Sequence, residues 1–204
     1  MESIDVLKHE FEAAFGHPAK RIFSACGRSE LCGNHTDHQH GLVLACGVNL
    51  SALAFAAPND KNEIRLVSKG FSECAVALDA TQPDPGEYGT TAALLRGVLN
   101  GLIERGANPF GLDIYVVSHV LSGSGLSSSA AIEVLLGGVM NGYFLDGELD
   151  GTALAVIGQR AENVYFGKPS GLLDQMACAL GGIQFFDFAD PAYPIAERVD
   201  YDFA

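Results

Sequence analysis

Apolar residues along the chain follow two spacings, one typical of strands and the other typical of helices. Alternating or continuous apolar runs predict strands over residues 22–25, 42–57, 63–68, 74–78, 112–120, 183–188 and 195–199. Helical spacing predicts helices over residues 4–15, 90–104, 152–165 and 172–180, and a further helix after residue 131. The elements are intermixed without a regular strand–helix–strand rhythm. The expected fold class is therefore α+β, with a mixed sheet and helices packed mainly on one side, rather than a Rossmann fold.

A stretch of small residues, S-G-S-G-L-S-S-S-A-A at 122–131, joins the strand at 112–120 to the helix that follows it. Gly123 and Gly125 permit left-handed backbone angles and the close approach of a ligand. The helix cap could come from any one of three hydroxyls, those of Ser127, Ser128 and Ser129. Free amide groups and the positive end of the helix dipole then suit an anion such as phosphate, and the hydroxyls suit Mg²⁺. The motif is neither a P-loop nor G-x-G-x-x-G, so an ordinary tight turn with a serine cap is the alternative.

A polar stretch follows the first short strand, over residues 26–41, and reads C-G-R-S-E-L-C-G-N-H-T-D-H-Q-H-G. Three histidines and an aspartate lie close together in it and could form a metal cluster, namely His35, Asp37, His38 and His40. A solvated polar loop is the plainer interpretation of the same residues.

One carboxylate falls in apolar surroundings near the end of the chain. Asp174 is flanked by four apolar residues, Leu172, Leu173, Met176 and Ala177. A carboxylate in such surroundings must be paired or have a shifted pKa, and such groups concentrate at active sites. The alternative is an aspartate placed at the start of a helix because the helix dipole favours it.

Composition narrows the classes of protein that remain. The 204 residues are 48% hydrophobic and 18% charged, as expected of a globular chain with a sizeable core. The net charge of −13 argues against nonspecific binding to nucleic acid or to an acidic membrane. Five scattered cysteines without a C-x-x-C motif favour a reduced, cytoplasmic location. Neither a signal pattern nor an uninterrupted apolar stretch of membrane-spanning length is visible.

Three stretches together resemble the GHMP small-molecule kinases, the family of galactokinase, homoserine kinase and mevalonate kinase. Residues 122–131 resemble the family's second motif, with Leu121 where the family usually has proline. Residues 27–37, G-R-S-E-L-C-G-N-H-T-D, resemble the galactokinase signature G-R-V-N-L-I-G-E-H-T-D. Residues 159–182 resemble the stretch in which a Q-x-A-E-N helix leads into C-G-x-x-D-Q, with Ser170 in place of the cysteine. The resemblance implies that residues 1–204 form a GHMP kinase N-terminal domain, with the fold known as ribosomal protein S5 domain 2-like.

The resemblance also implies roles for individual residues. Asp174 would be the catalytic aspartate, and Arg28 would stabilise the charge that develops during phosphoryl transfer. The sugar would be bound by Asn34, His35, Thr36, Asp37 and the backbone of Gly171. The phosphates of ATP would be bound by Ser122, Gly123, Ser124, Gly125, Leu126, Ser127, Ser128 and Ser129. Mg²⁺ would be bound by Ser129 and Glu162.

The expected reaction converts ATP and galactose, or a close relative, to the sugar 1-phosphate and ADP. The chain has Glu30 and Asn34 where the family has Asn and Glu, and this exchange permits an N-acetylgalactosamine or arabinose kinase instead. A sugar-binding regulator on a catalytically dead kinase fold is a further alternative. By comparison with galactokinases the C-terminal GHMP domain is expected to be absent. The isolated chain should then fold, turn over poorly, and expose a partly apolar face through which it could self-associate.

Overall fold

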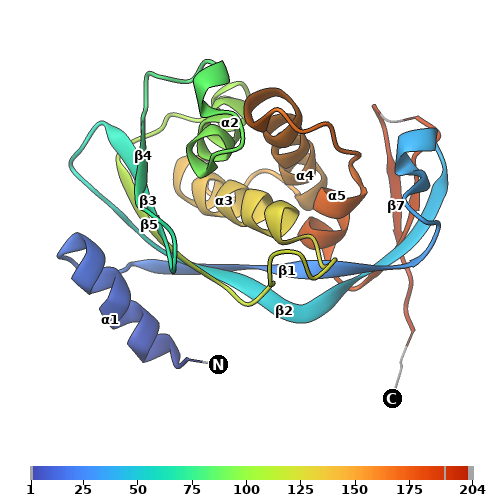
Figure 1. Cartoon of the computed structure of the whole chain (residues 1–204), viewed down its shortest axis with the longest axis horizontal. Helices are drawn as coiled ribbons and strands as arrows, with labels where there is room; N and C mark the ends of the chain where they lie inside the picture. Colours follow the sequence, from blue (N-terminus) through green and yellow to red (C-terminus); the bar gives the residue numbers. More distant parts are fainter. Residues whose placement is uncertain (1, 191, 202–204) are drawn as a thin grey trace.

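The computed structural model describes residues 2–190 and 192–201 (Figure 1). The strands are β1 (Arg21–Cys32), β2 (Leu42–Pro58), β3 (Glu63–Ser68), β4 (Cys74–Ala77), β5 (Leu112–Ser118), β6 (Ile183–Asp187) and β7 (Ile195–Arg198). The helices are α1 (Ile4–Phe15), α2 (Thr91–Ile103), α3 (Ser128–Phe144), α4 (Gly151–Arg160) and α5 (Leu173–Leu180). Short helical turns are η1 (Thr36–Gln39), η2 (Pro85–Glu87) and η3 (Ala161–Phe166), of which η3 is a π-helix.

The strands form a single mixed sheet in the order β4-β3-β5-β2-β6-β7, and β1 pairs with β2. Within the described part of the chain, β3 and β5 pair in parallel and the other strand pairs are antiparallel. Strand β2 curves and serves both halves of the sheet, because its residues 42–46 pair with β6 and its residues 52–58 pair with β5. The mixed sheet was predicted from the sequence and is confirmed.

Helices α2 to α5 cover one face of the sheet, and α1 lies against the other face (Figure 1). Successive side chains of β2 point to opposite faces of the sheet and contribute to the helix layer on each face. Ala54 and Ala56 belong to the large core beneath α2 and α3. Phe55 faces the opposite way and packs with Leu7 and Phe11 of α1 in a smaller core. Small alanines on one side and an aromatic ring on the other thus set the spacing of the two layers. The arrangement confirms the prediction of an α+β fold with helices mainly on one side.

Two sequence-based boundaries differ from the structure. The strand expected at 22–25 continues to Cys32, so much of the polar stretch expected as a loop is strand β1. The register between β1 and β2 shifts between Cys26 and Arg28 and again between Glu30 and Cys32. Such bulges break the period-two pattern that would have revealed the strand. The helix expected over 152–165 ends as an α-helix at Arg160 and continues as the π-helix η3.

A buried charge network ties α1 to the sheet. Asp113 of β5 is fully buried and accepts hydrogen bonds from Arg65 Nε at 2.8 Å, Arg65 Nη2 at 2.7 Å and Asn59 Nδ2 at 2.6 Å. The imidazole Nε2 of His17, just after α1, lies 2.8 Å from Asp113 Oδ2. Burial alone would raise the pKa of Asp113, but these hydrogen bonds outweigh it and lower the pKa. The aspartate is therefore a structural anion that connects three segments.

All five cysteines are free thiols. Across residues 2–190 and 192–201, no helix has the length and apolar character needed to span a bilayer.

Candidate active site

The glycine-serine loop precedes α3 and adopts left-handed backbone angles at three residues. The φ angles are 75° at Gly123, 77° at Gly125 and 56° at Ser127. Ser127 occupies the N-cap position of α3, but its hydroxyl makes no capping hydrogen bond. The hydroxyl instead donates to Asp174 Oδ2 at 2.6 Å. The cap prediction is corrected accordingly, because the left-handed backbone at Ser127 directs its side chain toward α5 rather than to the first turn of α3.

The same loop lies directly on strand β1. The backbone amide of Arg28 donates to the carbonyl oxygen of Leu126 at 3.1 Å. A Cβ atom added to Gly27 would stand 2.9 Å from that carbonyl oxygen and 2.9 Å from Val120 Cγ1. Glycine at this position therefore allows the loop to rest against the strand.

Arg28 connects the loop to the aspartate of α5. Its side chain is largely buried, and its Nε and Nη2 atoms lie 2.7 Å and 2.6 Å from Asp174 Oδ1. Its Nη1 atom donates to the carbonyl oxygen of Gly125 at 2.8 Å. Asp174 stands in the first turn of α5, with both carboxylate oxygens bound, one by Arg28 and the other by Ser127. The predicted pairing of this carboxylate is thus present, and the partners come from β1 and the loop.

A second carboxylate faces the segment that leads into α5. Asp37 of η1 is 9% exposed, and its Oδ2 atom accepts a hydrogen bond from the amide of Leu173 at 3.1 Å. Its Oδ1 atom is buried and has no partner among the described residues. A Cβ atom added to Gly171 would overlap Asp37 Oδ2. Since an unsatisfied buried acceptor is costly, the free oxygen suits a hydroxyl donor from a ligand.

The other residues predicted to bind sugar lie on the turn before Asp37. Asn34 and His35 are exposed, and both have φ angles of 56°. The carboxylate of Glu30 accepts from the backbone amide of His35 at 2.9 Å and 3.1 Å. The hydroxyl of Thr36 donates to the carbonyl oxygen of Leu42 at 3.1 Å. Glu30 therefore shapes the turn instead of standing in for the glutamate that the family has at the position of Asn34.

Glu162 of η3 is 3% exposed and lies between α3 and α5. Its Oε1 atom accepts from Ser129 Oγ at 3.3 Å and lies 2.7 Å from Lys168 Nζ. Its Oε2 atom accepts from Gln175 Nε2 at 3.1 Å. The hydroxyl of Ser129 and the carboxylate of Glu162 thus converge as two oxygen ligands, a set that suits Mg²⁺ completed by water and phosphate oxygens.

A buried glutamate next to this pair escaped the sequence-based reasoning. Glu133 of α3 is fully buried, and its Oε2 atom accepts from Gln175 Nε2 at 2.9 Å. Burial, followed by the nearby charge of Glu162, raises the pKa of Glu133 to about 8. The signal that could have revealed it is a glutamate inside the apolar run at residues 130–136. Gln175 gave no comparable signal, because its partner Glu133 lies 42 positions away in the sequence.

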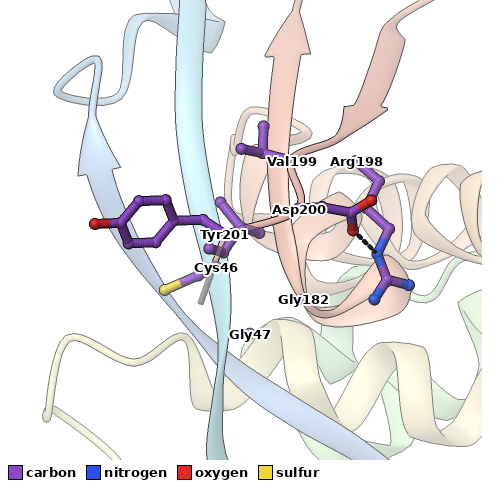
Figure 2. A pocket seen from close by; sticks show the side chains of 8 residues that line it. Cys46, Gly47, Gly182, Arg198, Val199, Asp200 and Tyr201 are labelled. Atoms are coloured by element: carbon purple, nitrogen blue, oxygen red, sulfur yellow. Dashed lines mark hydrogen bonds and ion pairs between the residues drawn. The ribbon is translucent and has the colours of Figure 1, made fainter. Parts of the chain in front are cut away.

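An apolar cavity of about 540 Å³ adjoins the loop. Its lining includes Leu66, Leu94, Val116, Ser129, Ile132 and Phe166. A second cavity of about 390 Å³ lies where β2, β6 and the segment after β7 meet (Figure 2). Among the described residues, none of the predicted site residues lines the second cavity, whose Arg198 and Asp200 pair with each other at 3.2 Å. The first cavity is therefore the one that belongs to the candidate site.

The histidines and the aspartate of residues 35–40 do not form a metal site. Across residues 2–190 and 192–201, no three or more His, Cys, Asp or Glu side chains are grouped so that they could hold a metal ion. The proposed cluster of His35, Asp37, His38 and His40 is therefore wrong.

Comparison with known families matches both halves of the site. The family "GHMP kinases N terminal domain" matches residues 93–182, and "Galactokinase galactose-binding signature" matches residues 9–58. The chain belongs to the GHMP kinase family. In this GHMP kinase chain, the first range contains the glycine-serine loop, Glu162 and Asp174, and the second contains Arg28 and Asp37.

Individual GHMP kinases resemble the chain over most of its length. It is 35% identical to a galactokinase of Lacticaseibacillus casei over 182 residues, which are 89% of this chain and 46% of that protein. It is 38% identical to a galactokinase of Streptomyces coelicolor, over 88% of this chain and 47% of that protein. The structure of Lactococcus lactis galactokinase complexed with galactose matches with a TM-score of 0.83 and 26% identity, over 97% of this chain and 52% of that one. The chain thus spans about half the length of the curated relatives it matches.

Proposed function

We propose that the chain forms the substrate-binding part of an ATP-dependent sugar kinase, which phosphorylates galactose or a close relative at the anomeric hydroxyl. The products are the sugar 1-phosphate and ADP. One observation carries the proposal: Arg28 binds both the carboxylate of Asp174 and the carbonyl oxygen of Gly125 in the glycine-serine loop. A single cation thus joins a candidate proton acceptor to a candidate phosphate-binding loop. The likeness to galactokinases supports the choice of sugar.

On the acceptor side, Asp37 and Asp174 would meet the sugar. The unpaired Oδ1 atom of Asp37 accepts a sugar hydroxyl, and the backbone of Gly171, which packs against the same carboxylate, would contact the sugar ring. Asp174 orients the anomeric hydroxyl and accepts its proton as the oxygen attacks phosphorus. Ser127 and Arg28 fix the position of the Asp174 carboxylate, so little reorganisation accompanies the reaction.

On the nucleotide side, the amide groups at the start of α3 and the loop 122–129 would surround the phosphates. The apolar cavity of about 540 Å³ next to the loop is of a size and character suited to the adenine base. Arg28 neutralises charge that builds up on the transferring group. When bound to Ser129 and Glu162, Mg²⁺ would neutralise phosphate oxygens and orient them. Five free cysteines support a reduced, cytoplasmic location.

Two alternatives remain distinct from this proposal. The first is a related GHMP kinase that acts on N-acetylgalactosamine or arabinose. One observation favours it: the Glu30 carboxylate binds the backbone amide of His35 and not a ligand. The turn before Asp37 then presents neutral Asn34 to the sugar. A sugar-binding regulator without catalysis is disfavoured, because Arg28, Asp174 and Glu162 are all present and paired in one site.

The test is a single-turnover experiment with the 204-residue chain in excess over ATP labelled at its γ-phosphate. A single-turnover format detects transfer even in a slow enzyme. Galactose, N-acetylgalactosamine and arabinose are offered separately, with glucose as a matched control. We expect labelled galactose 1-phosphate to form fastest. Transfer to another sugar of the panel would select the related kinase.

A further inference from the structure

Lys168 reaches from the solvent to a buried carboxylate of the site. It lies in the segment between η3 and α5, and its Nζ atom is 2.7 Å from Glu162 Oε1. The side chain of Lys168 is 59% exposed, whereas that of Glu162 is 4% exposed. The backbone amide of Lys168 also donates to the carbonyl oxygen of Glu162 at 3.1 Å. The lysine is therefore fixed at its backbone, and its ammonium group stands at the boundary between solvent and the buried carboxylate.

The ammonium group also stands beside the candidate phosphate site. The oxygen that it contacts, Glu162 Oε1, is the same oxygen that accepts from Ser129 Oγ in the first turn of α3. Ser129 and Phe166, two residues before Lys168, both line the apolar cavity next to the loop. A cation, a hydroxyl and a helix N-terminus thus converge at one place, which is a combination that binds phosphate oxygens.

Lys168 lies among three carboxylates of the site. The carboxylates of Glu162, Glu133 and Asp174 all act on its ammonium group. Asp174 is already paired with Arg28, which also binds the carbonyl oxygen of Gly125. Lys168 therefore provides a second positive charge on the Glu162 side of the site. Its exposed stem lets the ammonium group move without disturbing the core.

We propose that Lys168 is the counter-ion of Glu162 in the absence of a divalent ion, and that it binds a nucleotide phosphate once a divalent ion takes Glu162. The inference rests on the proposed function, one half on its divalent ion at Glu162 and the other half on its nucleotide. A divalent ion and the ammonium group compete for one oxygen atom, so binding of the ion releases the lysine toward the phosphates. The buried carboxylate is thereby paired with a cation at every stage, first with Lys168 and then with the divalent ion.

The first experiment measures Mn²⁺ binding by electron paramagnetic resonance without nucleotide, with Mn²⁺ as the probe for a divalent ion. The chain is compared with Lys168→Met, Lys168→Arg and the control Lys61→Met, in which the lost lysine is 54% exposed and pairs with Glu63. Removing the competitor should tighten Mn²⁺ binding to Lys168→Met by about fivefold, and the two other variants should resemble the parent. Unchanged or weaker binding to Lys168→Met would overturn the counter-ion role.

The second experiment compares ADP with adenosine by calorimetry, once with a chelator and once with Mg²⁺. With Mg²⁺, Lys168→Met should lose about tenfold in affinity for ADP and keep its affinity for adenosine, and Lys168→Arg should recover most of the loss. With the chelator the loss should be small, because Lys168 then pairs with Glu162. With Mg²⁺, equal losses for both ligands, or no loss for ADP, would overturn the phosphate-binding role. A parent chain that binds neither ligand would overturn the proposed function and this half of the inference, and the Mn²⁺ experiment would still decide the other half.

A stability control separates these roles from a loss of folding. Lys168→Met leaves the buried carboxylate of Glu162 without a cation, so its melting temperature is measured alongside the double variant Lys168→Met/Glu162→Gln. The double variant should regain the melting temperature of the parent and remain weak toward ADP. Recovery of ADP binding in the double variant would show that Lys168 acts only through Glu162, and the phosphate contact would be rejected.

Discussion

Gly171 lies against Asp37 so closely that a Cβ atom at Gly171 would overlap the Oδ2 atom of the carboxylate. The two residues come from opposite ends of the chain, one from η1 and the other from the segment just before α5. The amide of Leu173 donates to the same oxygen at 3.1 Å. The absence of a side chain at position 171 therefore positions the carboxylate, in addition to any contact that the glycine backbone makes with a ligand.

Substitution Gly171→Ala should displace Asp37 and weaken sugar binding by about tenfold, because a buried acceptor is moved away from its hydroxyl donor. ATP-analogue binding should change little, since neither Gly171 nor Asp37 lines the cavity next to the loop. Calorimetry with each ligand measures both effects. Gly138→Ala is the matched control, because a Cβ atom there meets nothing within 4 Å. Equal weakening toward sugar and nucleotide would indicate a general disturbance of the site instead.

Substitution Asp174→Asn should abolish most phosphoryl transfer while preserving the fold and sugar binding. The amide cannot accept the proton of the hydroxyl, and the loss expected for such a group is roughly 10²–10⁴-fold. The single-turnover assay measures the rate, and circular dichroism reports folding. The exposed carboxylate of Asp5 in α1 provides a control as Asp5→Asn. A transfer rate near that of the parent would remove Asp174 from the mechanism.

The buried Glu133 should make stability depend on pH. Its pKa is about 8 in the folded chain, against an ordinary value of 4.5. Between these values the folded chain holds a proton that the unfolded chain releases, so stability should fall as pH rises through this range and level off above it. Glu133→Gln, which is neutral at every pH, should remove this slope. Each loss of about 1 kcal/mol lowers the melting temperature of a chain this size by roughly 2–4 °C.

Melting curves of the parent and Glu133→Gln, recorded between about pH 5 and about pH 9, test this expectation. The two curves should separate as pH increases, with the variant becoming relatively more stable. Parallel curves would mean that Glu133 ionises normally in the folded chain.

Asp113 should matter for stability and not for ligands. Asp113→Asn leaves Arg65, whose side chain is 17% exposed, without its carboxylate, and the expected loss is about 3 kcal/mol in the free energy of unfolding. The double variant Asp113→Asn/Arg65→Met should lose less, because no uncompensated cation remains. Urea denaturation measures both. A single variant as stable as the parent, or a double variant less stable than the single one, would contradict the assigned role.

The sequence predicts the layers of this fold well, because α3, β2 and β5 carry long, unambiguous apolar patterns. It also identifies the glycine-serine loop, since Gly123 and Gly125 mark the left-handed positions directly. The extent of β1 was not predictable from periodicity, since its two register shifts interrupt the alternation. The partner of Ser127 was not predictable either, because a local capping rule says nothing about a carboxylate 47 positions away. Contacts between elements distant in sequence, such as Lys168 with Ser129 through Glu162, require the fold itself.

Arg28 has a consequence for how two ligands influence each other. Its backbone amide binds Leu126, its Nη1 atom binds Gly125, and its Nε atom binds Asp174. In the proposed complex, a displacement of the loop by phosphates would therefore also displace Arg28, the partner of Asp174. The binding free energies of nucleotide and sugar are then linked by a single interaction term. Nucleotide must then change the dissociation constant of the sugar by the same factor by which sugar changes the dissociation constant of the nucleotide. Shortening the Arg28 side chain should bring both factors toward one.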